Sequence, residues 1–484
     1  GDLLIETTIC RLLPYTPAVD RFSVQDLLSQ GPIEAVKPYV LKSLGLRSSD
    51  PITCMKESAM CALPLSKPEP TYGALPHPIR EFFNDQYYRA YRLVADMRHP
   101  STGLYRDAYV MAGQERLPSS IAATGVGLIA LTIADNEGWE TEAVEKAVLT
   151  LRAMAGELPE VDVARDKSTG FIAHFIDVNT GARRWNSENS TIDTALLVSG
   201  ALFAMQYFKG QREIARLATK LYHSIRWEAA IASPTSGEIF LKIEKGQGIE
   251  PLAPYNEYSL LAHMARGTAQ GRQLWQQVYS PECLHLLPSQ PVGPGRAIIC
   301  EEDNIPSSFV YQFPYYLVHE YTQSPVYNQL YANIAFADHW DWTVCHKAPT
   351  FVWGHGAGVT PKGGYHADAI GRNPEHVASP YIIAGFLSVY PQGIYDLYDI
   401  YRTIIPYDEA PMHLQDPWQR ARFHAAYKYG LSRFQFSPRA RTLWYPEHTA
   451  VIDWSSMLYG LTAFKHGAAF FARYNQVDEL DLAS

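Results

Sequence analysis

The stretch Ser190-Thr-Ile-Asp-Thr-Ala-Leu-Leu-Val-Ser-Gly-Ala-Leu-Phe-Ala-Met-Gln-Tyr-Phe208 decides how this chain folds. From Thr191 onward it is nearly all apolar, and Ser190 with Asp193 fits the S/T-x-x-D pattern that caps a helix N-terminus. A helix that is apolar on most sides has to be buried by other elements. The stretch therefore predicts a helix in the interior of a helical array.

Many other segments have apolar residues at helical spacing. The predicted helices are 78 to about 98, 119–136, 141–155, 191–208, 213–227, 258–266, 325–340, 381–389, 394–404, 417–429 and 454–472. Strand signals are short: 170–177, followed by the turn Asn179-Thr-Gly181, and 239–243. No short fixed repeat is visible, which disfavours a solenoid. The sequence predicts an all-α fold with decorated loops, and antiparallel helical hairpins in a ring would use this number of helices.

The first 77 residues differ from the rest of the chain. They are rich in Pro and Ser, and they end in the Pro-heavy stretch 63–78. We predict two parts: an N-terminal extension over 1–77 that wraps over or links to the main domain, and a main domain over 78–484.

Composition excludes several classes of protein. Of the 484 residues, 47% are hydrophobic and 19% charged, which is enough apolar content for a large core and too much for a disordered chain. The net charge of −9 disfavours a nucleic-acid partner. The sequence has no run of 18 apolar residues, so it predicts no transmembrane helix. Aromatic residues reach 12%, which suits a surface that stacks on flat apolar faces, sugar rings among them. We expect a secreted or periplasmic protein whose signal segment is absent from this chain.

The six cysteines form no C-x-x-C pair, so the sequence gives no sign of a zinc site. Cys54 with Cys61, and Cys283 with Cys300, are close enough in sequence for local disulfides, although buried free thiols are the alternative. Three motifs are absent: the nucleotide-binding loop G-x-x-x-x-G-K-[ST], the zinc-protease motif H-E-x-x-H and the hydrolase motif G-x-S-x-G. We expect no cofactor and no metal.

Acidic residues near helix starts, beside aromatic residues, are the remaining candidates for chemistry. Glycoside hydrolysis needs two carboxyl groups that flank the scissile bond. Glu257, in Tyr255-Asn-Glu257, and Asp193 each lie in the first turn of a predicted helix, and their spacing alone favours a role at the helix terminus over a catalytic one. Glu447 and Asp453 lie six residues apart between aromatic residues, just before the last predicted helix.

A Gly-rich loop carries His355, His366 and Asp368. Two histidines and one aspartate would suit a metal ion, but their spacing matches no known ligand pattern. Contact with a substrate is the alternative that we favour for these three side chains.

Several stretches together resemble the glucoamylase-like family of bacterial proteins. They are Ser120–Leu128 with Gly138-Trp139, Gly170–Asp177, Ser190–Leu197 with Gly200, Tyr255-Asn-Glu257, Gln312-Phe-Pro-Tyr315, Val377–Pro380, Tyr390-Pro391 and Gly460-Leu461. The resemblance spans about residues 80 to 475. The family includes endo-β-1,2-glucanases, and a related domain occurs in cyclic β-1,2-glucan synthases. The resemblance implies an (α/α)6 barrel with a cleft at one mouth and an inverting mechanism.

The resemblance also implies roles for individual acids. The family's general acid lies in the motif that corresponds to Tyr255-Asn-Glu257, which makes Glu257 the first candidate for the proton donor. The candidates for the base are two positions near the last helix. The family has Asp at the first and Glu at the second, whereas this chain has Glu447 and Asp453. Glu447 is the predicted base and Asp453 the alternative.

The predicted activity is endo-acting, inverting hydrolysis of β-1,2-glucan. Glucan transfer or hydrolysis of another β-glucan in the same barrel is the second hypothesis, and a non-catalytic glycan-binding protein is the third. Loops and helix starts that a barrel turns toward one mouth supply the predicted substrate cleft. Its predicted residues are His174, Asp177, Trp185, Asp193, Gln312, Tyr315, Trp353, His355, Tyr365, His366 and Asp368.

Overall fold

The computed structural model describes residues 69–293, 296–404, 428–437 and 442–476. Most of the predicted extension over 1–77 and of the predicted helix over 417–429 lies outside the described residues, as do Cys54 and Cys61. The α-helices are α5 (His77–Asp96), α6 (Ile121–Asn136), α7 (Ala143–Met154), α8 (Thr191–Tyr207), α9 (Arg212–His223), α10 (Ser259–Met264), α11 (Ala269–Leu274), α12 (Phe309–Leu317), α13 (His319–Gln323), α14 (Pro325–Trp340), α15 (Pro380–Gly385), α16 (Gly393–Asp399), α18 (Val451–His466) and α19 (Ala469–Tyr474). Single π-helical turns extend α11, α14 and α16 over Trp275–Tyr279, Asp341–Cys345 and Ile400–Ile404.

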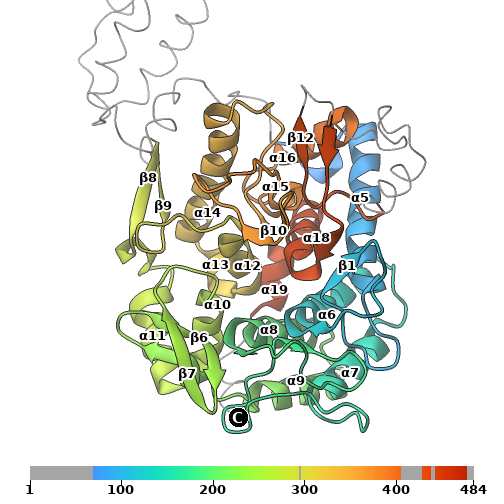
Figure 1. The fold of residues 1–484 in the computed structure, drawn as a ribbon, viewed down its shortest axis with the longest axis vertical. Coiled ribbons are helices and arrows are strands. Elements are labelled where there is room, and N and C mark those ends of the chain that lie inside the picture. The colour runs from blue at the N-terminus through green and yellow to red at the C-terminus, as the bar shows by residue number, and fades with distance from the viewer. Residues whose placement is uncertain (1–68, 294–295, 405–427, 438–441, 477–484) are drawn as a thin grey trace, which may run out of the picture.

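Six of these helices close into a ring. Helix α6 contacts α8, α8 contacts α10, α10 contacts α12, α12 contacts α15, α15 contacts α18, and α18 returns to α6. Helices α5, α7, α9, α11, α14 and α16 pack outside this ring (Figure 1). Each outer helix precedes or follows an inner one in the chain, so the described residues form the predicted (α/α)6 barrel.

Small residues allow the inner helices to approach closely. A Cβ atom at Gly200 would lie 2.2 Å from the Gly125 carbonyl oxygen, and one at Gly460 would lie 1.8 Å from that of Ala384. The first pair joins α8 to α6, and the second joins α18 to α15. The apolar stretch after Ser190 is helix α8, whose residues from Thr191 to Ala204 are buried except Asp193. Its interior position is the one predicted.

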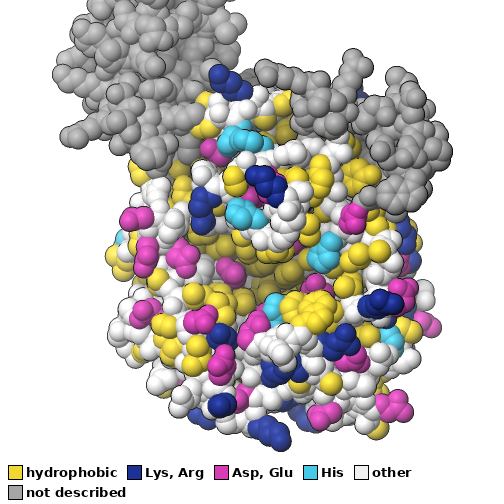
Figure 2. All heavy atoms as spheres, viewed as in Figure 1, with side chains coloured by type: hydrophobic (Ala, Val, Ile, Leu, Met, Phe, Trp, Pro, Cys, Tyr) yellow, Lys and Arg dark blue, Asp and Glu magenta, His cyan; other side chains and the backbone are white. Residues whose placement is uncertain are grey.

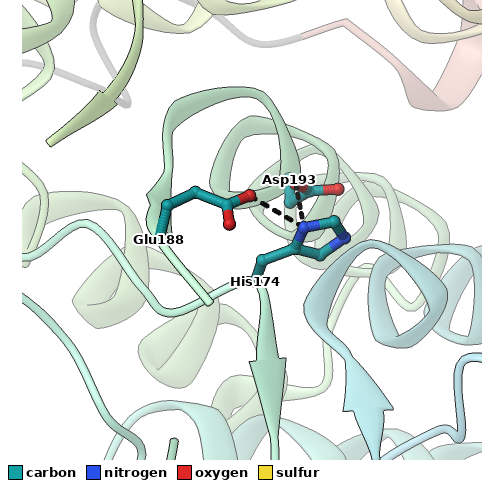
Figure 3. Close-up of side chains that lie close together, drawn as sticks. All are labelled: His174, Glu188 and Asp193. Carbon is teal, nitrogen blue, oxygen red and sulfur yellow. Dashed lines mark hydrogen bonds and ion pairs between the residues drawn. The ribbon is translucent and has the colours of Figure 1, made fainter. Parts of the chain in front are cut away.

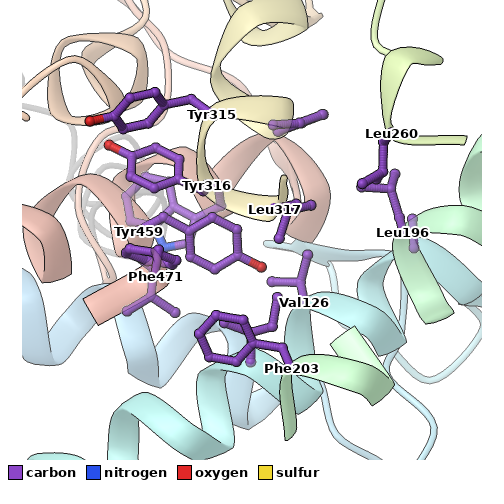
Figure 4. Packing of buried hydrophobic residues seen from close by; sticks show 14 of the residues in the cluster. Val126, Leu196, Phe203, Leu260, Tyr315, Tyr316, Leu317, Tyr459 and Phe471 are labelled. Carbon is purple, nitrogen blue, oxygen red and sulfur yellow. The ribbon is translucent and has the colours of Figure 1, made fainter. Parts of the chain in front are cut away.

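One end of the barrel is sealed by α19. Its Phe471 packs against Phe203 of α8, Tyr316 of α12 and Tyr459 of α18 (Figure 4). These contacts lie toward the C-terminal ends of the inner helices. The open mouth is therefore at the N-terminal ends of the inner helices.

Short antiparallel strands join the loops at this mouth. The strands are β1 (Ala108–Val110), β2 (Ser119–Ser120), β3 (Phe175–Ile176), β4 (Asn189–Ser190), β5 (Ile231–Ser233), β6 (Glu238–Glu244), β7 (Gln247–Leu252), β8 (Ser289–Gly293), β9 (Arg296–Ile299), β10 (Ala357–Val359), β11 (Tyr365–Ala367), β12 (Gln435–Ser437), β13 (Thr442–Trp444) and β14 (His448–Ala450). The pairs β1–β14, β2–β3 and β4–β6 each connect the loops that precede two neighbouring inner helices. The residues at the helix starts are thereby fixed relative to one another.

Some predicted boundaries are wrong. The segment 454–472 is two helices, because Gly467 has a φ of +79° and ends α18 at His466. Helix α12 was not predicted, since Pro314 lies inside it. Cys283 and Cys300 are free thiols, so the predicted alternative of a disulfide between them is wrong. Within the described part of the chain, no helix combines the length and apolar character needed to cross a bilayer.

Candidate active site

Acidic side chains gather at the mouth of the barrel, where the inner helices begin. Figure 2 shows the middle of this face hollowed, with hydrophobic, acidic and histidine side chains around the hollow. The floor is apolar: a small cavity between helices α6, α8, α12 and α18 is lined by Val126, Ile129, Leu196, Phe313, Leu317, Ile452, Ser455 and Tyr459. Charge placed over such a floor is poorly solvated, so its protonation depends on the neighbouring side chains.

Asp193 and His174 form the best-connected group at this mouth. The Ser190 hydroxyl caps α8, accepting from the Asp193 backbone N–H at 3.1 Å and donating to the Asp193 carboxylate. His174 Nδ1 lies 2.9 Å from Glu188 Oε1 and 3.7 Å from Asp193 Oδ2 (Figure 3). Burial alone would lower the pKa of His174, but the charges of Asp193 and Glu188 raise it to about 9. The imidazolium therefore balances part of the acidic charge.

His174, Glu188 and Asp193 are also the one group among the described residues whose ligand atoms lie close enough for a metal ion, within 4.8 Å of one another. The His174 ring already pairs with both carboxylates in the structure. The ion pairs explain the arrangement without a metal.

Glu257 is half-buried just before helix α10, as predicted from the Tyr255-Asn-Glu257 motif. Asn256 caps the turn, since its Oδ1 accepts the Tyr258 N–H at 3.0 Å. Burial raises the pKa of Glu257 to about 7, and the charges of Glu301 and Asp193 act in the same direction. A carboxyl group with this pKa can carry a proton near neutral pH, as a general acid must.

Asp453 is buried in the first turn of α18. The Tyr365 hydroxyl donates a hydrogen bond to Asp453 Oδ1 at 3.2 Å. Burial raises the pKa of Asp453 to about 7, although the positive charge of Arg433 acts against this shift. The other predicted base, Glu447, is exposed in the loop before β14, and its carbonyl oxygen accepts the Met111 N–H at 3.0 Å.

Asp107 is a further carboxyl group at the mouth, and no sequence motif points to it. It precedes β1, and its carbonyl oxygen accepts the Val451 N–H at the start of α18. Burial raises the pKa of Asp107 to about 6, and the charge of Asp193 adds to the effect. Asp107 in turn raises the pKa of Asp453, so it links the two sides of the mouth. In the sequence, Asp107 simply follows Arg106 in an irregular loop. Such a position does not indicate a functional site.

Three further predicted residues lie on one hairpin. Tyr365 and His366 belong to β11, and both are exposed, Tyr365 at 60%. Asp368 is buried, 2.6 Å from His366 Nδ1 through its Oδ1, and paired through Oδ2 with Arg433. Tyr365 is therefore hydrogen-bonded to Asp453, whereas His366 and Asp368 are linked to Arg433.

Trp185 and Asp177 lie on the opposite hairpin. Trp185 is 59% exposed, and its ring meets Phe175 edge-on with centroids 5.0 Å apart. Asp177 accepts the backbone N–H groups of Asn179 and Thr180 and pairs with Arg184 at 3.1 Å. These contacts give Asp177 a structural role in the predicted Asn-Thr-Gly turn.

Four predicted cleft residues are buried inside the protein. Gln312 donates to the Ile382 carbonyl oxygen, and Tyr315 donates to Asn328 and stacks on Tyr331. The other two belong to the Gly-rich loop but point inward: Trp353 donates to Asp396, and His355 Nε2 lies 2.8 Å from Asp341. The structure does not bring these four side chains to the surface of the mouth, and we leave them out of the proposed cleft.

Comparison with known proteins gives structural relatives only. No family model and no curated protein sequence matches this chain. The endo-β-1,2-glucanase from Chitinophaga pinensis, solved with sophorotriose and glucose, has a TM-score of 0.65 at 15% identity, over 84% of this chain and 97% of that chain. The β-1,2-glucanase from Parabacteroides distasonis has a TM-score of 0.64 at 15% identity, over 82% of this chain and 58% of that chain.

A third structure is the endo-β-1,2-glucanase from Talaromyces funiculosus in complex with sophorose. Its TM-score is 0.55 at 13% identity, over 82% of this chain and 86% of that chain. At these identities the likeness concerns the fold. It confirms the predicted fold class and, at the level of the fold, the predicted resemblance to glucoamylase-like proteins.

Proposed function

We propose that this protein is a glycoside hydrolase that cleaves β-1,2-glucan internally with inversion at the anomeric carbon. The observation that carries the proposal is the half-buried Glu257 at the mouth of the barrel, with a pKa raised to about 7. A general acid of this kind protonates the leaving oxygen. Relatives of the same fold are β-1,2-glucanases, which supports this substrate over other glycans.

The second carboxyl group activates water on the opposite face of the sugar. Burial and the Tyr365 hydroxyl support Asp453 for this role ahead of Glu447, which is exposed. Tyr365 orients the carboxylate, and a base with a pKa near the working pH is the most effective. An inverting site needs about 6.5–9.5 Å between the two carboxyl groups to hold the water.

The remaining mouth residues would bind the sugar chain. Trp185 and Tyr365 present exposed rings that can stack on the apolar faces of glucose residues. His174, Asp193 and His366 offer polar atoms to the hydroxyl groups, and no cofactor has a role in this scheme. The ligand is a β-glucan oligosaccharide or polysaccharide.

Product analysis on linear β-1,2-glucan tests the proposal. Thin-layer chromatography should show a ladder of short oligosaccharides, and β-1,3- and β-1,4-glucans of the same length should remain uncut. Longer or cyclic products would indicate glucan transfer. Binding without any product would indicate a glycan-binding protein, and cleavage of another β-glucan alone would move the proposal to that linkage.

A further inference from the structure

Arg433 is a buried cation near enough to the candidate base, Asp453, for its charge to act on that carboxyl group. Its side chain is 2% exposed and lies in the segment before β12. Every donor of a guanidinium in such a place needs an acceptor, because an unpaired buried charge is strongly destabilising. The acceptors that Arg433 uses show which parts of the mouth it connects.

Three of the acceptors belong to the β10–β11 hairpin and its flanking residues, and the fourth lies at the start of α15. Arg433 donates to the carbonyl oxygens of Val359, at 2.9 Å, and Gly356, at 3.5 Å, on the β10 side. It also pairs with Asp368, which follows β11. Its Nε donates to Ser379 Oγ, at the N-terminus of α15, at 3.2 Å. One planar guanidinium therefore fastens both strands of the β10–β11 hairpin to the barrel.

The backbone is shaped to receive this side chain. Gly358, in β10, has a φ of +139°, and a Cβ atom there would lie 2.8 Å from Arg433 Cδ. Tyr381 of α15 clamps the same strand, since its hydroxyl accepts from the Ala357 N–H and donates to the Ala357 carbonyl oxygen. The hairpin is thus fixed along β10, while the residues of β11 are exposed.

The exposed strand carries two side chains toward the site. Gly358 pairs with His366 and Val359 with Tyr365, so both lie opposite the anchored strand. Tyr365 donates to Asp453. Asp368 accepts from Arg433, and an ionised carboxylate only accepts, so His366 Nδ1 carries the proton of the His366–Asp368 hydrogen bond.

We propose that Arg433 is a positioning residue for the reaction: it fixes the β10–β11 hairpin so that Tyr365 holds Asp453 and Asp368 holds His366 at the mouth. This inference rests on the proposed function. Arg433 touches no substrate in this scheme. It acts through the hairpin and through its charge.

The charge of Arg433 gives the inference a signature that a purely structural role lacks. The charged or titratable groups that face Asp453 are Arg433, Tyr365, Tyr381 and Asp107. Of these only Arg433 is a cation, and it stabilises the ionised form of Asp453. Removing this cation should therefore raise the pKa of Asp453.

The test is the pH dependence of kcat/KM on linear β-1,2-glucan for Arg433→Met and Arg433→Lys. Arg433→Met should move the acid limb of the pH profile, where kcat/KM falls as Asp453 becomes protonated, to higher pH by about one unit or more. Arg433→Lys keeps the charge, so its acid limb should stay near the wild-type position, even where kcat falls because the planar fork is lost. The inference would be overturned if the acid limb of the pH profile lay at the same pH in wild type and Arg433→Met. It would also be overturned if the acid limb shifted equally in both variants.

Two more variants keep the inference testable if Arg433→Met does not fold. Tyr365→Phe removes a donor to the carboxylate, so the acid limb should move to higher pH. Asp368→Asn removes the counter-charge of Arg433, so the limb should move to lower pH. Shifts of the same sign in the two variants, or no shift in either, would contradict a role for Arg433.

An NMR titration separates this inference from the proposed function. Carboxyl-labelled aspartate, with the Asp453 signal assigned by its loss in Asp453→Asn, reports the pKa of Asp453 without any turnover. If the wild type cleaves no β-glucan, the proposed function fails, while the titration still tests Arg433. A pKa of Asp453 that is the same in wild type and Arg433→Met would reject the electrostatic role directly.

Discussion

Two carboxyl groups at the mouth have pKa values near 7 because each is desolvated, Glu257 before α10 and Asp453 in α18. Glu257 has to be protonated to act as the acid, so activity should fall as the pH rises above about 7. Asp453 has to be ionised to act as the base, so activity should fall as the pH drops below about 7. We predict a narrow bell-shaped profile of kcat/KM centred near pH 7. A broad plateau from pH 4 to 6, checked with initial rates, would contradict the assignment.

Glu257→Gln should lower kcat by at least about 10²-fold and leave glucan binding intact, because the amide keeps the shape but cannot protonate the leaving oxygen. Glu302→Gln is the matched control: it is exposed and close to Glu301, and should keep wild-type activity. Rates come from reducing-end assays and binding from calorimetry. Full activity in Glu257→Gln would remove the central role of this residue.

The two candidate bases can be told apart by comparing Asp453→Asn with Glu447→Gln. We expect Asp453→Asn to be inactive and Glu447→Gln to retain most of its rate, since Glu447 is exposed. The reverse result in a reducing-end assay would assign the base to Glu447. Circular dichroism of both variants checks that each is folded.

The sequence was sufficient for residues whose position follows from a motif at a helix start. Ser190 and Asp193 were predicted at a helix N-terminus and lie there, and Glu257 lies in the turn just before α10. Asp107 was missed because its importance comes from neighbours that are distant in sequence, Val451 and Asp193. Trp353 and His355 were predicted at the mouth, but a loop sequence does not indicate which of its side chains point inward.

At the scale of elements, apolar periodicity predicted the long helices within a few residues, α5, α6 and α14 among them. Local breakers account for the errors. Pro314 concealed α12, since proline removes a backbone donor and favours a helix end. Gly467 separates α18 from α19, and the sequence around it is apolar enough to read as one helix.

Close contact between inner helices leads to a stability prediction. Gly460→Ala should destabilise the barrel by about 1–3 kcal/mol, because the new methyl group collides with the Ala384 carbonyl oxygen. Without this collision, alanine would stabilise a helix interior relative to glycine. Gly73→Ala is the control, since nothing lies within 4 Å of its Cβ position. Thermal unfolding should show a lower Tm for Gly460→Ala only, and equal Tm values would mean that the helices can separate at little cost.

At the scale of the whole molecule, the ring explains how residues far apart in sequence share one site. Each inner helix begins at the same mouth, and strand pairs such as β1–β14 tie the first part of the barrel to the last. The fold class could be predicted because a nearly continuous apolar helix such as α8 needs helices around it. The order of side chains around the mouth depends on loop conformations and could not.

The most direct test of the central claim is ¹H NMR of linear β-1,2-glucan during the first minutes of the reaction. We predict that the wild type releases new reducing ends first as the α-anomer, because inversion of a β-linkage gives an α-product. Glu257→Gln should release none. New ends that first emerge as the β-anomer, or no new ends at all with the wild type, would contradict the account.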